Sequence, residues 1–301
     1  MSGKPHISVC ICTFRRPELL GRLLEGLRCQ ETGGLFGYSI VVADNDQAES
    51  ARNVVSAFLA TAAVKVTYCV EPERNIALTR NKALANGTGE FCAFIDDDEF
   101  PAKDWLLTLF KACDKYRADG VLGPVEPFFE DDPPEWIVKG KFYDRPRHET
   151  GFVIPWTEGR TGNLLFRRAI LTGIEPVFQP KFGSGGEDRD FFVRMIPRGH
   201  VFVWCDEAVA FETVPPVRWK RTFMLKRALL RGKMSLNRRS MGPRAILSSM
   251  AAIPLYSLAL PFLMLMGHHH FMKYLIKLCD HAGRILALLG INPIRETYVV
   301  T

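Results

Sequence analysis

The stretch FCAFIDDDEF, residues 91–100, passes from five apolar residues directly into four consecutive carboxylates. A short, continuously apolar run of this kind is typical of a strand that is buried on both faces. Adjacent carboxylates repel one another, and each loses hydration when it is buried. The stretch therefore predicts a buried strand whose end carries clustered negative charge that a cation must compensate.

The segments around this stretch alternate between apolar strands and amphipathic helices. Besides residues 90–96, we expect strands at 6–14, 38–44 and 64–71, and the helices that separate them begin near Pro17, Ala48, Asn75 and Lys103. Strands that are apolar throughout and separated by helices predict a mostly parallel sheet with helices on both faces. With right-handed crossovers this is a doubly wound, Rossmann-like α/β architecture.

The acids fall on one edge of the predicted sheet. Asp44 ends the second strand, and Asp96, Asp97 and Asp98 follow the fourth. Ligands of open parallel sheets bind at the carboxyl ends of the strands. Mg²⁺ or Mn²⁺ takes one or two carboxylates and completes its shell with water and substrate phosphates. The run therefore predicts a divalent metal beside a diphosphate, with a solvated acidic loop tip as the alternative.

The second half of the chain changes character. Residues 124–161 are rich in proline and aromatic residues and are expected to be irregular, whereas 213–244 hold ten Lys/Arg and no Asp/Glu. Such a basic block predicts a solvated helix face, an anionic membrane surface or phosphate partners. No nucleic-acid partner is expected. The eight cysteines show no metal spacing and predict reduced, mostly buried thiols in a cytoplasmic protein.

Residues 245–267 contain no charged side chain, and that length can span a hydrocarbon core. Pro254 and Pro261 would kink such a helix, so a re-entrant or interfacial hairpin is possible, and a buried core helix is the alternative. Arg238, Arg239 and Arg244 favour the cytoplasmic side for what precedes it. Residues 271–290 predict an amphipathic helix at a membrane surface, preceded by a polar histidine turn at 268–270.

Several motifs occur in a fixed order along the chain: ICTFRR at 11–16, VVADND at 41–46, RNIALTRNKAL at 74–84, FIDDD at 94–98, GNLLFRR at 162–168 and GGEDRDFFVRM at 185–195. This series resembles the inverting family 2 glycosyltransferases of the GT-A fold over roughly residues 7–212. The overall layout looks like that of the succinoglycan-type exopolysaccharide glucosyltransferases. Two departures stand out: Glu212 replaces a histidine that related enzymes often have, and VRWKR around Trp219 lacks the glutamine of a processive synthase motif.

The resemblance assigns roles to residues on the donor side. Thr13, Phe14 and Arg15 are implied to hold the nucleotide, and Asp44 to hydrogen-bond the uracil ring. Arg80 is implied to lie near the nucleotide and the diphosphate. In the DXD motif, Asp96 contacts ribose or sugar, Asp98 binds the metal, and Asp97 lies between them on the nucleotide-sugar side.

On the acceptor side, the resemblance matches the acid pair Glu187 and Asp188, with Asp188 as the general base. Asn163 and Arg167 belong to the segment that lines the acceptor in similar enzymes, although a purely structural role at a strand end is the alternative. Trp136, Trp156 and Trp204 are either sugar-stacking or core residues. An inverting transfer needs one such base, and its leaving group needs no protonation when a metal stabilises it.

We therefore expect a GT-A domain at 1–212, with a nucleotide-sugar half at 1–120 and an acceptor half at 121–212. A basic helical linker at 213–244 and apolar membrane-associated helices at 245–301 follow. The expected reaction moves a sugar, expected to be glucose, from a UDP-sugar to a polyprenyl-diphosphate-linked glycan and forms a β-linkage. We expect it to take place at the cytoplasmic face of the cell membrane, where the protein also contacts membrane lipids. A non-catalytic membrane-bound partner of a polysaccharide assembly complex is the alternative. A sugar-phosphate nucleotidyltransferase is disfavoured because no Gly-rich phosphate loop follows the first strand.

Overall fold

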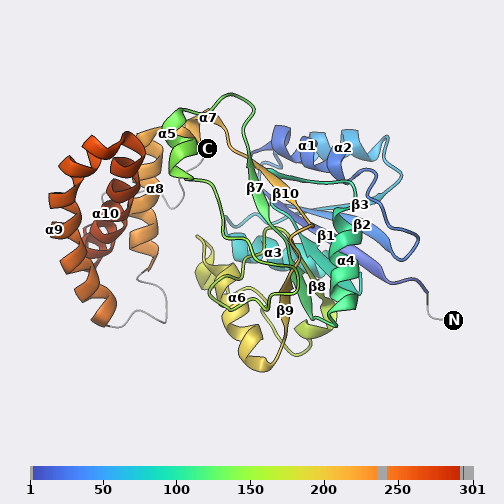
Figure 1. Ribbon diagram of the computed structural model, residues 1–301. Helices are drawn as coiled ribbons and strands as arrows, with labels where there is room; N and C mark the ends of the chain where they lie inside the picture. The colour runs from blue at the N-terminus through green and yellow to red at the C-terminus, as the bar shows by residue number, and fades with distance from the viewer. Residues whose placement is uncertain (1–2, 236–242, 292–293, 295–301) are drawn as a thin grey trace. The chain divides into compact units, whose positions relative to one another are not determined.

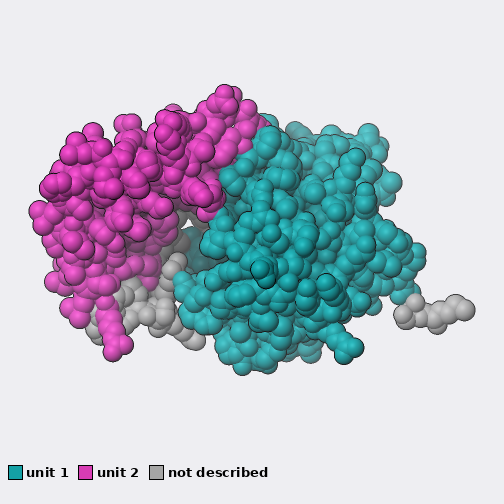
Figure 2. Space-filling model, viewed as in Figure 1, with its two compact units in different colours: residues 1–128, 145–213 teal, residues 129–144, 214–301 magenta. Residues whose placement is uncertain are grey.

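The computed structural model describes residues 3–235, 243–291 and 294. The chain forms two compact units, coloured separately in Figure 2: unit 1 comprises residues 1–128 and 145–213, and unit 2 comprises residues 129–144 and 214–301. Residues 129–144, which the sequence placed in the acceptor half, thus belong to the unit of the C-terminal helices. Arg238 and Arg239 lie outside the described residues.

Unit 1 is built on a mixed sheet of seven strands among the described residues (Figure 1). In spatial order these are β3 (Lys65–Val70), β2 (Gly37–Asp44), β1 (His6–Thr13), β4 (Phe91–Phe94), β8 (Leu164–Arg167), β6 (Gly120–Leu122) and β9 (Phe202–Trp204). Strands β3, β2, β1 and β4 are mutually parallel, whereas β8 runs antiparallel to both β4 and β6. This arrangement confirms the predicted mostly parallel sheet.

Helices cover both faces of this sheet, as the alternation along β1 requires. Ile7, Val9 and Ile11 join one buried cluster, and Cys10 and Cys12 join the other. The first cluster also contains apolar side chains of α1 (Pro17–Leu27), α2 (Arg52–Leu59) and α4 (Trp105–Lys115). The second contains those of α3 (Ile76–Asn86) and α6 (Glu187–Met195). All eight cysteines are free, and Cys29 is the exposed one among them.

A second, three-stranded sheet was not predicted. It has the order β5 (Glu99–Pro101), β10 (Ala210–Thr213) and β7 (Val125–Phe128), with β10 antiparallel to β5. The apolar stretch at 201–212 forms two strands rather than one, because the chain leaves the large sheet after Trp204 and enters the small one at Ala210. The polar turn containing Asp206 and Glu207 separates the two strands, because charged side chains would otherwise enter the buried ladder.

Unit 2 is helical. Its elements are α5 (Glu135–Gly140), α7 (Pro216–Trp219), α8 (Arg221–Met234), α9 (Pro243–Met266) and α10 (His268–Leu288). Helix α10 packs against α5, α8 and α9 (Figure 1). The ring of His268 lies 5.2 Å from that of Trp136 on α5, so this tryptophan is a packing residue of unit 2.

Helix α9 is one continuous helix through Pro254 and Pro261. By length and composition alone, residues 246–266 could cross a membrane, and 6% of this stretch is buried in the structure. Leu258 and Leu265 are 74% and 87% exposed. The alternative of a buried core helix is therefore wrong. The chain turns at Gly267, whose φ of +133° favours glycine, and returns as α10.

Candidate active site

The carboxyl ends of β1, β2 and β4 meet at one edge of the large sheet, as predicted. Thr13 is paired with Asp44 in the register of β1 and β2, and the acidic run follows β4. The hydroxyl of Thr13 donates a 2.8 Å hydrogen bond to Oδ2 of Asp97. Two segments that the sequence assigned to the nucleotide are thus in direct contact.

An arginine, not predicted for this role, neutralises part of the acidic run. Nη1 of Arg16 lies 3.0 Å from Oδ1 of Asp97 and 3.3 Å from Oδ2 of Asp98. Both aspartates are buried. Burial raises the pKa of Asp97 to about 6, and Arg16 opposes that shift. The turn between β1 and α1 therefore supplies one positive charge to the acidic run.

Arg80 on α3 joins the acidic run to the acid pair at α6. Its Nε donates to Oε1 of Glu187 at 3.1 Å, and its Nη2 donates to Oδ1 of Asp96 at 3.3 Å. Burial raises the pKa of Glu187 to about 7, and Arg80 opposes that shift. Oε2 of Glu187 is buried and has no hydrogen-bond partner among the described residues.

Local structure fixes the position of α3 and therefore of Arg80. Asn75 caps the helix, since its Oδ1 accepts from the backbone N–H groups of Ala77 and Leu78 at 3.1 and 3.2 Å. The Asn81 side chain both donates to and accepts from the backbone of Phe178. These bonds hold α3 against the segment that leads to α6.

Asp188 is the second residue of α6 and is partly exposed. The helix follows Gly186, whose φ of +94° lies in the left-handed region that glycine adopts freely. A Cβ at Gly183 would lie 2.3 Å from the Asn75 side chain, so only a glycine at this position lets the loop approach the cap of α3 this closely. The Gly-rich segment thereby brings Glu187 and Asp188 next to Arg80.

The family follows from a comparison with known sequences. Residues 8–172, more than half of the chain, match the family described as Glycosyl transferase family 2. The chain belongs to this family. It is 36% identical over 234 residues to the succinoglycan biosynthesis protein ExoM of Rhizobium meliloti, which covers 76% of this chain and 73% of that relative. It is 28% identical to a glucosyl-dolichyl phosphate glucuronosyltransferase of Haloferax volcanii, over 56% of this chain and 54% of that protein.

Solved structures show the GT-A fold for this glycosyltransferase. The mannosyltransferase PcManGT from Pyrobaculum calidifontis, in complex with GDP-Man and Mn²⁺, superposes with a TM-score of 0.62 at 18% identity and covers 96% of this chain and 88% of its own. The S. aureus TarS 1–349 complex with UDP superposes with a TM-score of 0.55 at 16% identity, over 96% of this chain and 93% of that chain.

Asp44 of this family 2 glycosyltransferase has no exposed surface. Its carboxylate accepts from the N–H groups of Asp46 and Ala51 at 3.0 and 2.8 Å and from the hydroxyl of Tyr68 at 2.9 Å. A carboxylate has about four acceptor sites, so a contact with uracil would use the one that these three donors leave and would need the buried oxygen to become accessible. Arg15, in contrast, is exposed and pairs with Asp46 at 2.9 Å. The guanidinium groups of Arg15 and Arg74 lie over the ring of Phe14, 5.0 and 4.8 Å from its centre.

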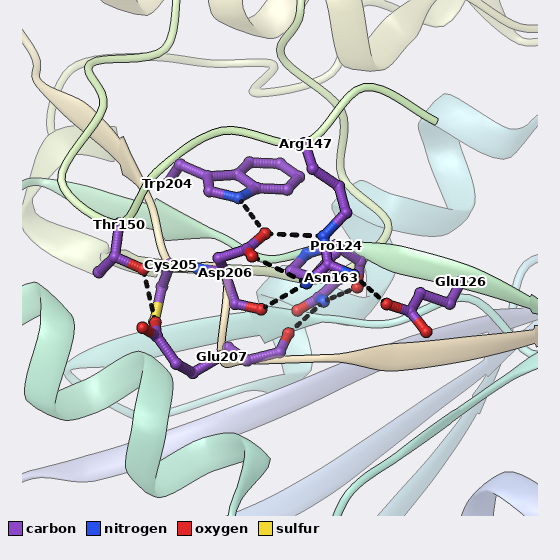
Figure 3. A network of polar contacts seen from close by, with 10 residues as sticks. Pro124, Glu126, Arg147, Thr150, Asn163, Trp204, Cys205, Asp206 and Glu207 are labelled. Carbon is purple, nitrogen blue, oxygen red and sulfur yellow. Dashed lines mark hydrogen bonds and ion pairs between the residues drawn. The ribbon is translucent and has the colours of Figure 1, made fainter. Parts of the chain in front are cut away.

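Asn163 has no exposed surface either, which differs from the expectation that it lines the acceptor side (Figure 3). Its Nδ2 donates to the carbonyls of Pro124 and Ala208 at 2.8 and 2.7 Å, and its Oδ1 accepts from Nε1 of Trp105 at 2.7 Å. Its φ of +56° is one that asparagine tolerates better than most residues. In this structure its side chain therefore joins strand ends rather than facing a ligand.

A polar network beside Asn163 holds the segment that begins at Arg147 (Figure 3). The Arg147 guanidinium forms an ion pair with Asp206 at 2.8 Å and another with Glu126. Asp206 also accepts from Nε1 of Trp204 at 3.0 Å. Trp204 is 1% exposed and is a core residue, whereas the partly buried Trp156 lies with its ring 4.9 Å from the guanidinium of Arg189, next to Asp188.

Glu212, at the position where related enzymes often have a histidine, lies opposite Glu99 in the β5–β10 register. The Arg145 guanidinium forms an ion pair with Glu212. Glu99 is 2% exposed, and burial followed by the charge of Asp96 holds its pKa well above the usual range. Sequence reasoning did not assign roles to Arg16, Glu99 or Arg145. Glu99 belongs to the acidic run itself, but only strand pairing places it opposite Glu212, and only the folded chain brings Arg16 and Arg145 to these acids.

Proposed function

We propose that this glycosyltransferase moves a sugar, with glucose as the expected one, from a UDP-sugar to a polyprenyl-diphosphate-linked glycan during assembly of an exopolysaccharide or another surface glycan. The observation that carries the proposal is the Arg80 guanidinium, which hydrogen-bonds both Asp96 of the acidic run and Glu187 of the acid pair. The name of the 36% identical relative supports the polysaccharide context. The solved complex of TarS with UDP supports a uridine nucleotide.

In the proposed reaction Asp188 is the general base. Its carboxylate takes the proton of the acceptor hydroxyl while that oxygen forms a bond to the anomeric carbon. The bond between the anomeric carbon and the diphosphate oxygen breaks on the opposite face, and its electron pair leaves with UDP. Attack opposite the leaving group inverts the centre, so an α-linked donor gives a β-glycoside. The nucleotide is held by Thr13, Phe14, Arg15 and Asp97, and by Asp44 through the acceptor site that its three hydrogen-bond donors leave.

The acidic run fits a hard divalent cation, Mg²⁺ or Mn²⁺. We propose Asp98 as its carboxylate ligand, and the carboxylate of Asp96 is 42% exposed beside it. A Cβ at Gly162 would lie 2.9 Å from Oε1 of Glu99 and 3.1 Å from Oδ2 of Asp96, so glycine keeps the space at these oxygens open. Among the described residues no three His, Cys, Asp or Glu side chains form a metal cluster, which suits an ion that keeps waters and phosphates as ligands.

When bound, such a cation supplies positive charge to the diphosphate leaving group. Because Asp98 accepts a hydrogen bond from Arg16 in this structure, metal binding is expected to compete with that ion pair. Arg16 and Arg80 also carry fixed positive charge to the same place. The protein's own contribution to the leaving group is therefore two guanidinium groups that lie against the acidic run.

We place the reaction at the cytoplasmic face of the cell membrane. The exposed apolar surface of α9 supports membrane association, and the basic residues between 213 and 244 support contact with anionic lipids. An acceptor anchored by a polyprenyl diphosphate would be presented at that surface.

The test is donor turnover by purified full-length protein in detergent, with a panel of nucleotide sugars and Mn²⁺, measured as released nucleoside diphosphate with and without EDTA. Asp188→Asn should keep UDP affinity and lower turnover by about 10²–10⁴-fold. Asp190→Asn, on the same helix and paired with Arg194 at 2.7 Å, is the matched control and should keep most activity.

Retained transfer in Asp188→Asn would remove the base assignment. Absence of UDP binding by the wild type in calorimetry would overturn the donor proposal and favour a non-catalytic partner of a polysaccharide assembly complex. Release of nucleotide from one UDP-sugar, abolished by EDTA, would support both the donor class and the metal.

A further inference from the structure

A pocket of about 240 Å³ lies between α8 and α10 in unit 2. Helix α8 contributes Arg231 and Gly232, Ser235 follows directly after its end, and α10 contributes Lys277, Asp280, His281 and Arg284. The volume is far above the ~15 Å³ that one water needs, so a phosphate group can enter. None of these residues belongs to the candidate active site in unit 1.

The two helices meet at their backbones beside the pocket. A Cβ at Gly232 would lie 2.1 Å from the carbonyl oxygen of Asp280, and a Cβ at Gly283 would lie 2.2 Å from that of Leu229. Only glycine permits these contacts. Small residues that bring helix backbones together are typical of helix pairs in membranes. The pocket is thus a fixed feature of a closely packed helix pair.

Among the described residues, the pocket is lined by two arginines, one lysine, one histidine and one carboxylate. That carboxylate is engaged, because Nε of Arg231 donates to Oδ1 of Asp280 at 2.8 Å. Lys277, His281 and Arg284 follow one another at positions i, i+4 and i+7 and therefore share one face of α10. Positive charge exceeds negative charge at this face, which favours an anionic ligand.

Hydroxyl groups hold the Arg284 side chain in the pocket. Its Nε donates to Oγ of Ser235 at 3.0 Å, and its Nη1 donates to Oγ of Ser249 on α9 at 2.8 Å. Nδ1 of His281 lies 3.0 Å from the same Ser249 hydroxyl. Hydrogen bonds from a guanidinium to hydroxyl oxygens are charge-assisted and fix its orientation. Arg284 is therefore pre-oriented where α8, α9 and α10 meet.

Ser249 also fixes where the pocket lies along the candidate span. The span covers Ile246–Met266, so Ser249 is within the first turn of the apolar helix. In a membrane, the start of such a helix lies at the level of the lipid headgroups. Basic pockets between membrane helices on the cytoplasmic side bind anionic headgroups. We infer that this pocket binds the phosphate headgroup of a membrane lipid.

The inference rests on the proposed membrane association of unit 2 and deepens it by naming a site. Two lipids carry the required chemistry: an anionic phospholipid of the bilayer and the polyprenyl diphosphate of the acceptor. Both present phosphate oxygens to the same arginine and lysine. They differ in the number of phosphates, so a binding series can tell them apart.

The experiment measures binding to full-length protein in neutral detergent by microscale thermophoresis. The probes are dihexanoyl phosphatidic acid, farnesyl diphosphate, inorganic phosphate and the zwitterionic dihexanoyl phosphatidylcholine. Lys277 is exposed, so Lys277→Gln leaves the packing intact; Lys273→Gln, equally exposed and one turn earlier on α10, is the matched control. Arg284→Gln is a second variant, checked for folding by its melting temperature.

We expect saturable binding of the anionic lipids and no binding of phosphatidylcholine. Lys277→Gln should bind the anionic lipids about fivefold more weakly than the wild type, and Lys273→Gln should bind them like the wild type. If farnesyl diphosphate binds at least tenfold more tightly than phosphatidic acid, the occupant is the acceptor diphosphate. Equal affinities for the two probes would identify bulk phospholipid as the occupant. Equal loss in both lysine variants, inorganic phosphate binding as tightly as the lipids, or no saturable binding would overturn the inference.

UDP affinity of the same variants separates this site from the active site. Lys277→Gln should bind UDP like the wild type, because its side chain belongs to unit 2. If UDP binding fails in the wild type while lipid phosphate still binds, the donor proposal fails and the pocket stands. If full-length protein stays out of membranes and binds no lipid phosphate, the membrane proposal and the pocket fail together while the catalytic one is untouched.

Discussion

Nε of Arg80 lies 3.1 Å from Oε1 of Glu187, and each side chain is less than a tenth exposed. The residues are 107 positions apart in the chain, and the same guanidinium also reaches Asp96. One buried cation therefore connects the end of β4, the middle of α3 and the start of α6. Removing either partner of such a buried ion pair is costly, because the remaining charge is then uncompensated in a low-dielectric environment.

Arg80→Gln should destabilise the fold and abolish donor turnover. Removing the guanidinium leaves Glu187 and Asp96 without their cation, and the expected loss is about 3–5 kcal/mol in urea unfolding. Lys82→Gln on the same helix is the control and should stay within about 0.5 kcal/mol of the wild type. Arg80→Lys should recover part of the stability, because it keeps the charge but loses the two-pronged geometry. Wild-type stability in Arg80→Gln would contradict the assignment.

The pH dependence of stability should reveal Glu187. Burial raises its pKa from 4.5 to about 7, so the folded protein holds this proton more tightly than the unfolded chain does. The associated stability is complete below about pH 4.5 and is lost as pH rises through about 7. Asp97, with its pKa raised to about 6, acts in the same direction. Glu187→Gln cannot ionise and should escape its share of this loss.

The measurement is urea unfolding of Glu187→Gln and wild type at pH 5 and pH 8. The stability of the variant relative to wild type should improve by on the order of 2 kcal/mol at the higher pH. Taking the difference between the variant and the wild type cancels the contribution of the histidines to the pH dependence of stability. Glu18→Gln, on the exposed face of α1, should show no such change. A difference that does not move with pH would show that Glu187 is ionised throughout.

Asn163→Ala should lower stability and leave UDP affinity unchanged. The substitution leaves Nε1 of Trp105 and the carbonyl of Ala208 buried without the partner that Asn163 supplies, at a cost of about 1–3 kcal/mol for each unsatisfied group. The carbonyl of Pro124 keeps its hydrogen bond from the N–H of Ala210. Thermal unfolding and calorimetry with UDP measure the two effects. Asn86→Ala, at the exposed end of α3, is the control. A raised KM for acceptor in a variant of normal stability would instead restore the acceptor role.

Polar substitutions on α9 should release the protein from membranes. Leu255, Leu258, Phe262 and Leu265 are between 65% and 87% exposed, so their replacement by glutamine removes exposed apolar surface without opening the packing against α10. Fractionation of cell extracts measures the effect, and UDP affinity should not change. Leu35→Gln with Leu59→Gln, exposed apolar residues of unit 1, is the control. A variant that stays in the membrane fraction would place the anchor elsewhere.

Strands β1 to β4 of the large sheet were predictable because their signal is local, whereas the three-residue strand β6 was not predicted. Each apolar strand, each amphipathic helix and the acidic edge after β4 can be found from periodicity over ten to fifteen residues. The order of the motifs then resembles family 2 strongly enough that the matched residues 8–172 only confirmed it. The apolar helix at 245–267 was equally visible, since length and absence of charge suffice to find it.

Other features depended on contacts between distant segments. Glu99 and Glu212 become neighbours only when β5 pairs with β10, and residues 129–144 join unit 2 only when α5 packs against α10. The roles of individual polar residues were decided in the same way. Asn163 looks like a ligand residue in the sequence, but its side-chain oxygen and nitrogen bond groups that the fold brings to them. The carboxylate of Asp44 likewise accepts three hydrogen bonds that the sequence did not predict, and its contact with the nucleotide stays a prediction.

The sequence by itself thus determined the fold class, the family and the edge of the sheet that carries the acids, because hydrophobic periodicity and strand ends are written in neighbouring residues. Only the tertiary structure decided which cations compensate those acids. Arg16 and Arg80 reach them from separate turns and helices, and an ion pair depends on distance in space rather than on separation along the chain.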